Sequence, residues 1–191
     1  MATRPRTSHE RNHKIDIGLT DQQRRGSIDI LNRIVADQHV LSLKTRKYHW
    51  NVIGPQFWAI HAMLEEQYEL LAAAIDETAE RVRQVGGNAI ATMREYVELA
   101  RLEEQPGVYP NARDMLHDLL HDHEAAIRNL REDIDRLADE LEDQTTADFV
   151  TSLAEQHEKI AWMLGSMVAD DHSLDEQEGS AGSRSDGKRK R

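Results

Sequence analysis

The positions of proline and glycine constrain the fold of this chain more than any other feature. Its 191 residues include four prolines and ten glycines, which cluster at a few points and leave long segments free of helix breakers. Apolar residues recur in these segments every three or four positions, the period of one helix face. The pattern predicts long helices over residues 21–53, 55–85 and 112–141, a fourth starting at Thr145 or Thr146, and a short helix from 92 to about 104. We therefore expect an all-α four-helix bundle with a short helix between the second and third long helices.

Composition narrows the class of protein. The chain has no cysteine, which excludes disulfide scaffolds, thiol catalysis and cysteine-ligated zinc or iron–sulfur sites. Its apolar runs fall short of the ~18 residues of a membrane span. Polar residues follow the basic N-terminal residues, where a secretory signal would have its apolar core. We expect a cytoplasmic protein with no membrane partner.

Charge separates the ends of the chain from its body. Residues 1–14 have a net charge of +3, and residues 188–191 are all basic. The segments 1–14 and 171–191 hold nine of the 24 basic and six of the 35 acidic residues. Residues 15–170 therefore contain 15 basic and 29 acidic residues and have a net charge of −14. We divide the chain into an N-terminal tail (1–19), a helical bundle (20–170) and a disordered C-terminal tail (171–191). Any contact with DNA is expected from the basic tails.

Candidate metal ligands lie along one side of the second predicted helix. His61 and Glu65 are four residues apart, Asp76 follows eleven residues after Glu65, and Glu80 follows four residues after Asp76. At about 100° per residue, eleven residues return to within about 20° of the same direction, so all four share one side. The turn after the first helix is expected to bring His49 close to His61. Mixed imidazole and carboxylate ligands suit iron, manganese or zinc better than calcium or magnesium.

Alternative roles for these residues remain open. Apolar neighbours predict that this side of the helix is buried, and a buried carboxylate needs a partner, either a metal ion or an ion pair with Arg81 or Arg83. A solvated helix face is the third possibility. His61 and Glu80 are nineteen residues apart, about 28 Å of helix, so one chain cannot place both on one metal ion. Two copies whose second helices pair antiparallel about a two-fold axis would form two identical sites.

Short motifs carry a resemblance to a known family. They are residues 47–57 (Lys-Tyr-His-Trp-Asn-Val-Ile-Gly-Pro-Gln-Phe), His61, Leu64-Glu65, Asp76, Ala79-Glu80-Arg81, Gly86-Gly87, His157-Glu158-Lys159 and Trp162-Met163-Leu164. Over roughly residues 20–170 the sequence resembles the Dps family, the ferritin-like mini-ferritins named as DNA-binding proteins from starved cells. The resemblance implies a ferritin-like four-helix bundle that assembles into a hollow dodecameric shell.

The resemblance also implies a function. A pair of irons would bind at each ferroxidase site, on a two-fold interface, where Fe(II) is oxidised and then stored as ferric mineral, protecting the cell against oxidative damage. Hydrogen peroxide is the expected oxidant, oxygen the other candidate, and Zn or Mn are possible substitutes for iron. The family's catalytic and metal-binding positions fall on His49, His61, Glu65, Asp76 and Glu80, with Glu65 a departure because Asp is common there. The alternative function is a nucleoid-associated, DNA-binding shell with a mainly architectural role.

Other side chains are candidates for supporting roles. Trp50 is expected to pack over the site, or else to intercept a stray oxidising equivalent. His157 is a candidate for a position behind the ligands, or for a hydrogen-bonded position in the core near Trp162. Asp135 and Asp139 lie on a helix face that is solvated by default, but in a shell they would be candidates to line a pore that concentrates Fe(II).

The remaining histidines are less suited to the site. His39 lies ten residues before the first candidate histidine, about 15 Å along the same helix, too far to share its metal ion. His117 and His121 lie on a densely charged helix and are expected at the surface. His9 and His13, four residues apart in the N-terminal tail, form a further candidate pair for a transition metal.

Overall fold

A computed structural model describes residues 15–169, and all regular secondary structure in this range is helical. The four long helices are α1 (Asp21–Asn51), α2 (Phe57–Gln84), α4 (Ala112–Asp135) and α5 (Gln144–Val168), with the short helix α3 (Met93–Leu99) between α2 and α4. The predicted all-α bundle is therefore confirmed. The proposed tails, with His9, His13 and the terminal basic residues, lie outside the described range apart from residues 15–19.

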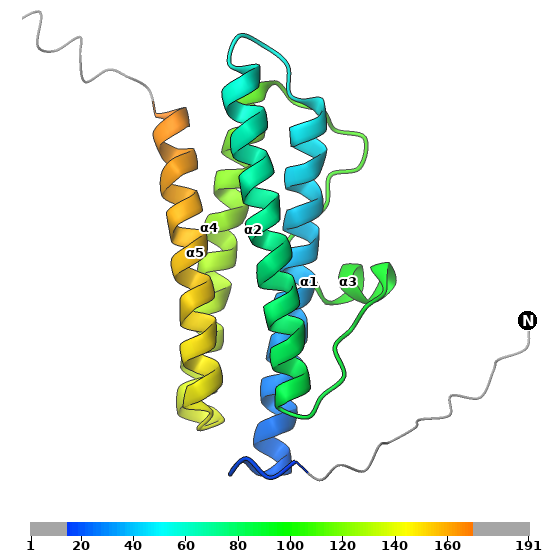
Figure 1. Cartoon of the computed structure of the whole chain (residues 1–191), viewed down its shortest axis with the longest axis vertical. Helices are drawn as coiled ribbons and strands as arrows, with labels where there is room; N and C mark the ends of the chain where they lie inside the picture. Colours follow the sequence, from blue (N-terminus) through cyan, green and yellow to red (C-terminus); the bar gives the residue numbers. More distant parts are fainter. Residues whose placement is uncertain (1–14, 170–191) are drawn as a thin grey trace, which may run out of the picture.

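The long helices form two antiparallel hairpins packed side by side (Figure 1). The first hairpin is α1 with α2, and the second is α4 with α5. Residues 85–111 cross from the end of α2 to the start of α4 along the length of the bundle, so α2 and α4 run in the same direction. This crossing segment carries α3, which packs beside α1 on the outside of the bundle.

Side-chain caps begin three of the helices at the predicted points. Thr20 forms a capping box with Gln23 at the start of α1, and Asn111 accepts a hydrogen bond from the Asp114 amide at the start of α4. At the start of α3 the Thr92 hydroxyl accepts from the Glu95 amide. These bonds satisfy amide groups that have no partner within the helix.

Other helix ends differ from the prediction. The fourth long helix starts at Gln144, because the cap is Asp143, whose carboxylate is buried and accepts from the amide and hydroxyl of Thr146. The second long helix starts at Phe57 rather than Pro55, which lies in the preceding turn. The short helix ends at Leu99 instead of about residue 104. The third long helix ends at Asp135, and a π-helical segment, η1 (Arg136–Glu140), follows it.

The bundle core consists of two apolar clusters separated by polar side chains. On α1, α4 and α5 the first cluster includes Leu41, Leu119 and Ile160, and the second includes Ile34, Leu130 and Leu153. Between these residues, along the same three helices, lie Gln38, His123 and His157, which are 2%, 0% and 3% exposed. From α2 the Thr78 hydroxyl lies 3.3 Å from Gln38 Oε1. We call Gln38, Thr78, His123 and His157 the polar layer.

No helix between residues 15 and 169 combines the length and the apolar character needed to cross a bilayer.

Candidate metal centre

Two histidines meet at the turn between α1 and α2. Nδ1 of His49 lies 2.8 Å from the carbonyl oxygen of His61, and Nδ1 of His61 lies 2.9 Å from the carbonyl oxygen of His49. The two rings are stacked with their centroids 3.7 Å apart, and Phe57 stacks on His61 at 4.9 Å. The expected approach of His49 to His61 is therefore present within one chain.

These two hydrogen bonds select one tautomer of each neutral imidazole. A carbonyl oxygen can only accept a hydrogen bond, so each Nδ1 carries the proton and donates. In a neutral imidazole the other nitrogen, Nε2, then has a free lone pair. A backbone hydrogen bond from the non-ligating nitrogen is how proteins usually orient histidine ligands of metal ions. In this tautomer, the Nε2 atom of each histidine can act as a donor to a metal ion.

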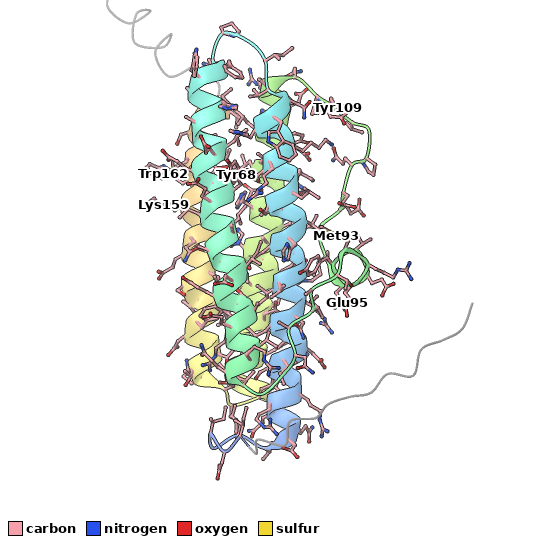
Figure 2. All side chains as sticks on the ribbon, turned by 45° about the vertical axis from the view of Figure 1, so that its right-hand side comes forward. Tyr68, Met93, Glu95, Tyr109, Lys159 and Trp162 are labelled. Atoms are coloured by element: carbon pink, nitrogen blue, oxygen red, sulfur yellow. The ribbon has the colours of Figure 1, made fainter. Side chains whose placement is uncertain are left out.

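Tyr68 connects the histidine pair to Glu65. Its phenol donates a hydrogen bond to Glu65 Oε1 at 3.2 Å, and its ring meets the His49 ring edge-on at 5.2 Å. The guanidinium of Arg46 lies over the Tyr68 ring at 4.6 Å. Tyr68 lies between α1 and α2 in the upper half of the bundle (Figure 2). Tyr68 is not among the site residues predicted from the sequence, although its position three residues after Glu65 places the two side chains on one face of the helix.

The carboxylates of the candidate site lie at the surface of the single chain. Glu65, Asp76 and Glu80 are all exposed, so the expected burial of this side of the helix is wrong for one chain alone. The core takes a stripe that includes Leu64 and Leu71. The acidic stripe is rotated away from it because successive helical residues point about 100° apart.

The alternative ion pairs with Arg81 and Arg83 are not formed. The guanidinium of Arg81 donates to the Thr146 hydroxyl at 2.9 Å and lies 3.9 Å from Asp143. Arg83 donates to Asn88 Oδ1 at 2.6 Å. Both arginines therefore hold helix ends and the connection after α2, and they leave the acidic stripe uncompensated.

One chain does not complete the predicted ligand set. Because α2 is continuous from Phe57 to Gln84, His61 and Glu80 stay about 28 Å apart. Among residues 15–169, no three His, Asp or Glu side chains lie close enough together to hold one metal ion. The structure brings His49, His61 and, through Tyr68, Glu65 to one end of α2, and leaves Asp76 and Glu80 toward the other.

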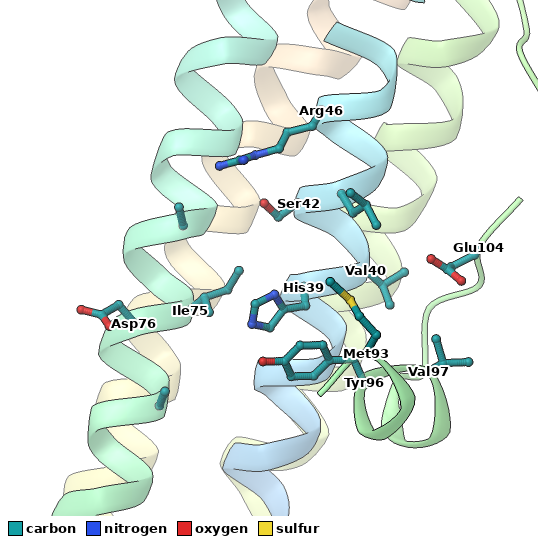
Figure 3. Close-up of a pocket in the computed structure, with 13 residues that line it drawn as sticks. His39, Val40, Ser42, Arg46, Ile75, Asp76, Met93, Tyr96, Val97 and Glu104 are labelled. Carbon is teal, nitrogen blue, oxygen red and sulfur yellow. The ribbon is translucent and has the colours of Figure 1, made fainter. Parts of the chain in front are cut away.

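A groove of about 390 Å³ runs beside Asp76, between α1, α2 and α3. Figure 3 shows Asp76 on α2 at one side of this groove, with His39 and Arg46 on α1. Its apolar lining includes the exposed side chains of Leu43 and Met93. The helix face that bears the distant carboxylates is thus partly hollow and partly apolar.

The side chains expected to support the site lie in different parts of the bundle. Trp50 is 65% exposed in the single chain, and Asp135 and Asp139 are exposed near the end of the α4–α5 hairpin. His157 is buried in the polar layer with His123 and so takes the internal position considered for it. Trp162, expected near it in the core, is exposed.

The other histidines behave as ordinary structural or surface groups. His117 and His121 are exposed, as expected. His39 stacks on Tyr96 with centroids 3.9 Å apart, and burial lowers the pKa of His39. None of these three histidines adds a ligand to the histidine pair at the α1–α2 turn.

The two-hairpin bundle with a crossing connection is the fold of a ferritin-like protein, and residues 28–173 match the family Ferritin, described as a ferritin-like domain. Within this class the chain belongs to the Dps family. It is 37% identical over 137 residues to DNA protection during starvation protein 2 of Bacillus anthracis, covering 72% of this chain and 92% of that protein. A low temperature-induced protein of Nostoc is 52% identical over 155 residues, covering 81% of this chain and 87% of that protein.

Solved structures agree with this assignment. DpsC from Streptomyces coelicolor superposes with a TM-score of 0.79 at 28% identity, covering 82% of this chain and 91% of that one. A Dps protein from Vibrio cholerae, described as a member of a superfamily of ferritin-like diiron-carboxylate proteins, gives a TM-score of 0.75 at 29% identity and covers 80% and 95%.

Proposed function

We propose that this protein is a mini-ferritin that oxidises Fe(II) at sites shared between two copies and stores the ferric product in a hollow, dodecameric shell, in the cytoplasm. The observation that carries the proposal is the division of the ligand set. His49 and His61 are oriented to bind a metal ion, while Asp76 and Glu80 are exposed and too far away to join them in the same chain.

Two copies related by a two-fold axis complete the set. With their α2 helices antiparallel, His49, His61 and Glu65 of one copy face Asp76 and Glu80 of the other. The exposed apolar groove beside Asp76 supplies surface for such a contact. Each site then has three carboxylates and two neutral imidazoles, a charge of −3 that favours binding a pair of Fe(II) ions.

This ligand set suits a two-electron oxidation. Two Fe(II) ions each give one electron to hydrogen peroxide, the O–O bond breaks, and two protons are consumed, which yields two Fe(III) ions and two water molecules. Because both electrons arrive together, no hydroxyl radical is released. The carboxylates stabilise the ferric product, while the imidazoles hold Fe(II) before oxidation. Oxygen is a slower candidate oxidant, and Zn(II) or Mn(II) is expected to compete with iron for the same donors.

The test starts from protein whose assembly size has been measured. Fe(II) is added without oxygen, and stoichiometric peroxide follows. The His49→Ala and His61→Ala double variant should assemble but lose the rapid phase of Fe(II) oxidation. The matched control replaces two exposed histidines on α4, His117 and His121, with Ala and should oxidise as the parent does. A double variant that assembles and oxidises Fe(II) at the parental rate would show that the site is elsewhere.

Two further roles follow from the shell. Asp135 and Asp139 are exposed together at one end of the bundle, and we propose that copies of this pair line a pore through which Fe(II) enters. A second function, DNA binding, is favoured by the +3 charge of residues 1–14 and by the basic residues 188–191. Repetition of these tails around a shell would multiply their attraction for phosphates.

A further inference from the structure

The proposed iron site does not use two histidines that are buried at the centre of the bundle. His123 on α4 and His157 on α5 face each other in the polar layer, with their Nδ1 atoms 2.9 Å apart. Both rings are enclosed by the bundle, and Nε2 of His123 is buried without a hydrogen-bond partner. The pair thus joins the two helices of the second hairpin within the polar layer, between the two apolar clusters of the core.

The distance between the two nitrogens allows only one proton between them. In the neutral pair, one Nδ1–H donates to the lone pair of the other Nδ1. A second proton would set N–H against N–H at 2.9 Å and would place a positive charge in the core. A proton added instead to the buried Nε2 of His123 would leave the Nδ1–Nδ1 hydrogen bond in place, but it would put a positive charge in the core on a nitrogen that has no partner. Burial therefore favours the pair in its uncharged form.

The surroundings of the pair offer no free counter-charge. From α1, Asp37 is paired with Arg101 of the crossing segment, and Lys44 is paired with Asp122 of α4. Asp133 of α4 is also paired with Arg101.

Uncharged side chains also lie beside the pair. A small cavity lined by His157 is lined as well by Gln38 and Leu41 of α1 and by Ala126 and Leu130 of α4, and Thr78 of α2 contacts Gln38. One turn away from His157 along α5 lie Leu153, Ala154 and Ile160, which are buried. A protonated His123 or His157 would have to break an existing ion pair or leave the core.

We propose that His123 and His157 form an acid-sensitive lock between α4 and α5, which holds the centre of the bundle while the pair is neutral and which stabilises the fold less as the surroundings become acidic. The lock involves none of the residues of the proposed iron site.

The direction of the pH effect follows from proton binding. Burial lowers the pKa of His157 to about 4 and lowers the pKa of His123 well below its usual value, with the charge of His157 adding to the effect on His123. In the unfolded chain both groups have a pKa near 6.5. Between about pH 6.5 and 4 the unfolded chain therefore binds more protons, so stability is complete above this interval and falls as pH decreases through it.

The experiment measures urea unfolding at fixed subunit concentration between pH 7 and pH 5. Proton linkage predicts that the unfolding constant of the parent rises by about 25-fold for each histidine, or about 600-fold for both. The His123→Leu and His157→Leu double variant removes both polar partners together, so neither remains unpaired. The unfolding constant of this double variant should not show the rise between pH 7 and pH 5. The control His117→Leu, at an exposed position on α4, should show the same rise as the parent.

A second variant and a direct measurement make the test independent of how well the double variant folds. His157→Gln keeps a hydrogen-bonding side chain beside His123 but removes one titrating group. The logarithm of its unfolding constant should therefore rise about half as much between pH 7 and pH 5 as that of the parent. NMR of the imidazole groups in the folded parent should show both rings of the pair neutral at pH 5.5. A pH response of the double variant as steep as that of the parent, or a titration of either ring near pH 6.5 in the folded protein, would overturn the proposal.

Discussion

His49 and His61 donate hydrogen bonds to each other's carbonyl oxygens across the α1–α2 turn. The last turn of α1 and the first turn of α2 therefore hold one another, and the same bonds leave both Nε2 atoms available to a metal ion. A change that alters this turn should affect iron binding even if it leaves every ligand in place.

Mixed assemblies test whether the site is shared between copies. A His61→Ala chain and a Glu80→Ala chain are each expected to be inactive in the rapid phase of Fe(II) oxidation. When they are refolded together, each pair of unlike chains has one site with both changes and one with neither, so part of the rapid phase should return. If assemblies shown to contain both chains recover no oxidation, the two-fold arrangement is wrong.

Tyr68→Phe tests the connection between the histidine pair and Glu65. The variant keeps the ring against His49 and Arg46 but loses the hydrogen bond to the carboxylate. A partly exposed bond to a charged acceptor contributes about 1 kcal/mol, so Fe(II) binding should weaken about fivefold in anaerobic titrations. Tyr109→Phe, at an exposed tyrosine, is the control, and equal affinities for the two variants would count against the role of Tyr68.

Arg101→Leu should be strongly destabilising. Arg101 bridges the buried carboxylates of Asp37 and Asp133, with N–O distances of 2.7 and 2.8 Å. Its removal leaves two buried carboxylates without a cationic partner, at a cost of about 3–5 kcal/mol in the free energy of unfolding. Burial already raises the pKa of both aspartates.

Without the arginine, both aspartates bind protons more readily in the folded protein than in the unfolded chain. The loss of stability caused by Arg101→Leu should therefore be smaller at pH 5 than at pH 7. Arg131→Leu removes an exposed pair with Glu158 and should cost less than about 1 kcal/mol. Similar unfolding midpoints for the two variants would contradict the assigned role of Arg101.

DNA binding should depend on the basic ends of the chain. Removal of residues 1–14 and 188–191 leaves an acidic body, so duplex binding should vanish, and in the parent it should weaken steeply with salt. Deletion of residues 171–187 alone keeps both basic segments and should preserve binding in a mobility-shift measurement. Binding by the doubly truncated protein at moderate salt would refute tail-driven binding.

The sequence by itself determined the helices and the class of the bundle. Helical periodicity and caps such as Thr20 with Gln23 depend on residues three or four positions apart, which are neighbours whatever the rest of the fold does. The same local geometry placed His61, Glu65, Asp76 and Glu80 on one side of α2. It also showed that one chain cannot bring the two ends of this set together.

The tertiary structure decided the features that depend on partners far apart in the chain. The end of α3 could not be predicted because the Arg101 amide bonds to Asp37, 64 residues away, and the start of α5 depends on Asp143, which is also bound by Ser27 of α1. The facing of His123 and His157 across 34 residues arises from the way α4 packs on α5. Burial along α2 was misjudged for the same reason: periodicity shows which residues share a face, but only the packing of the other helices shows which face they cover.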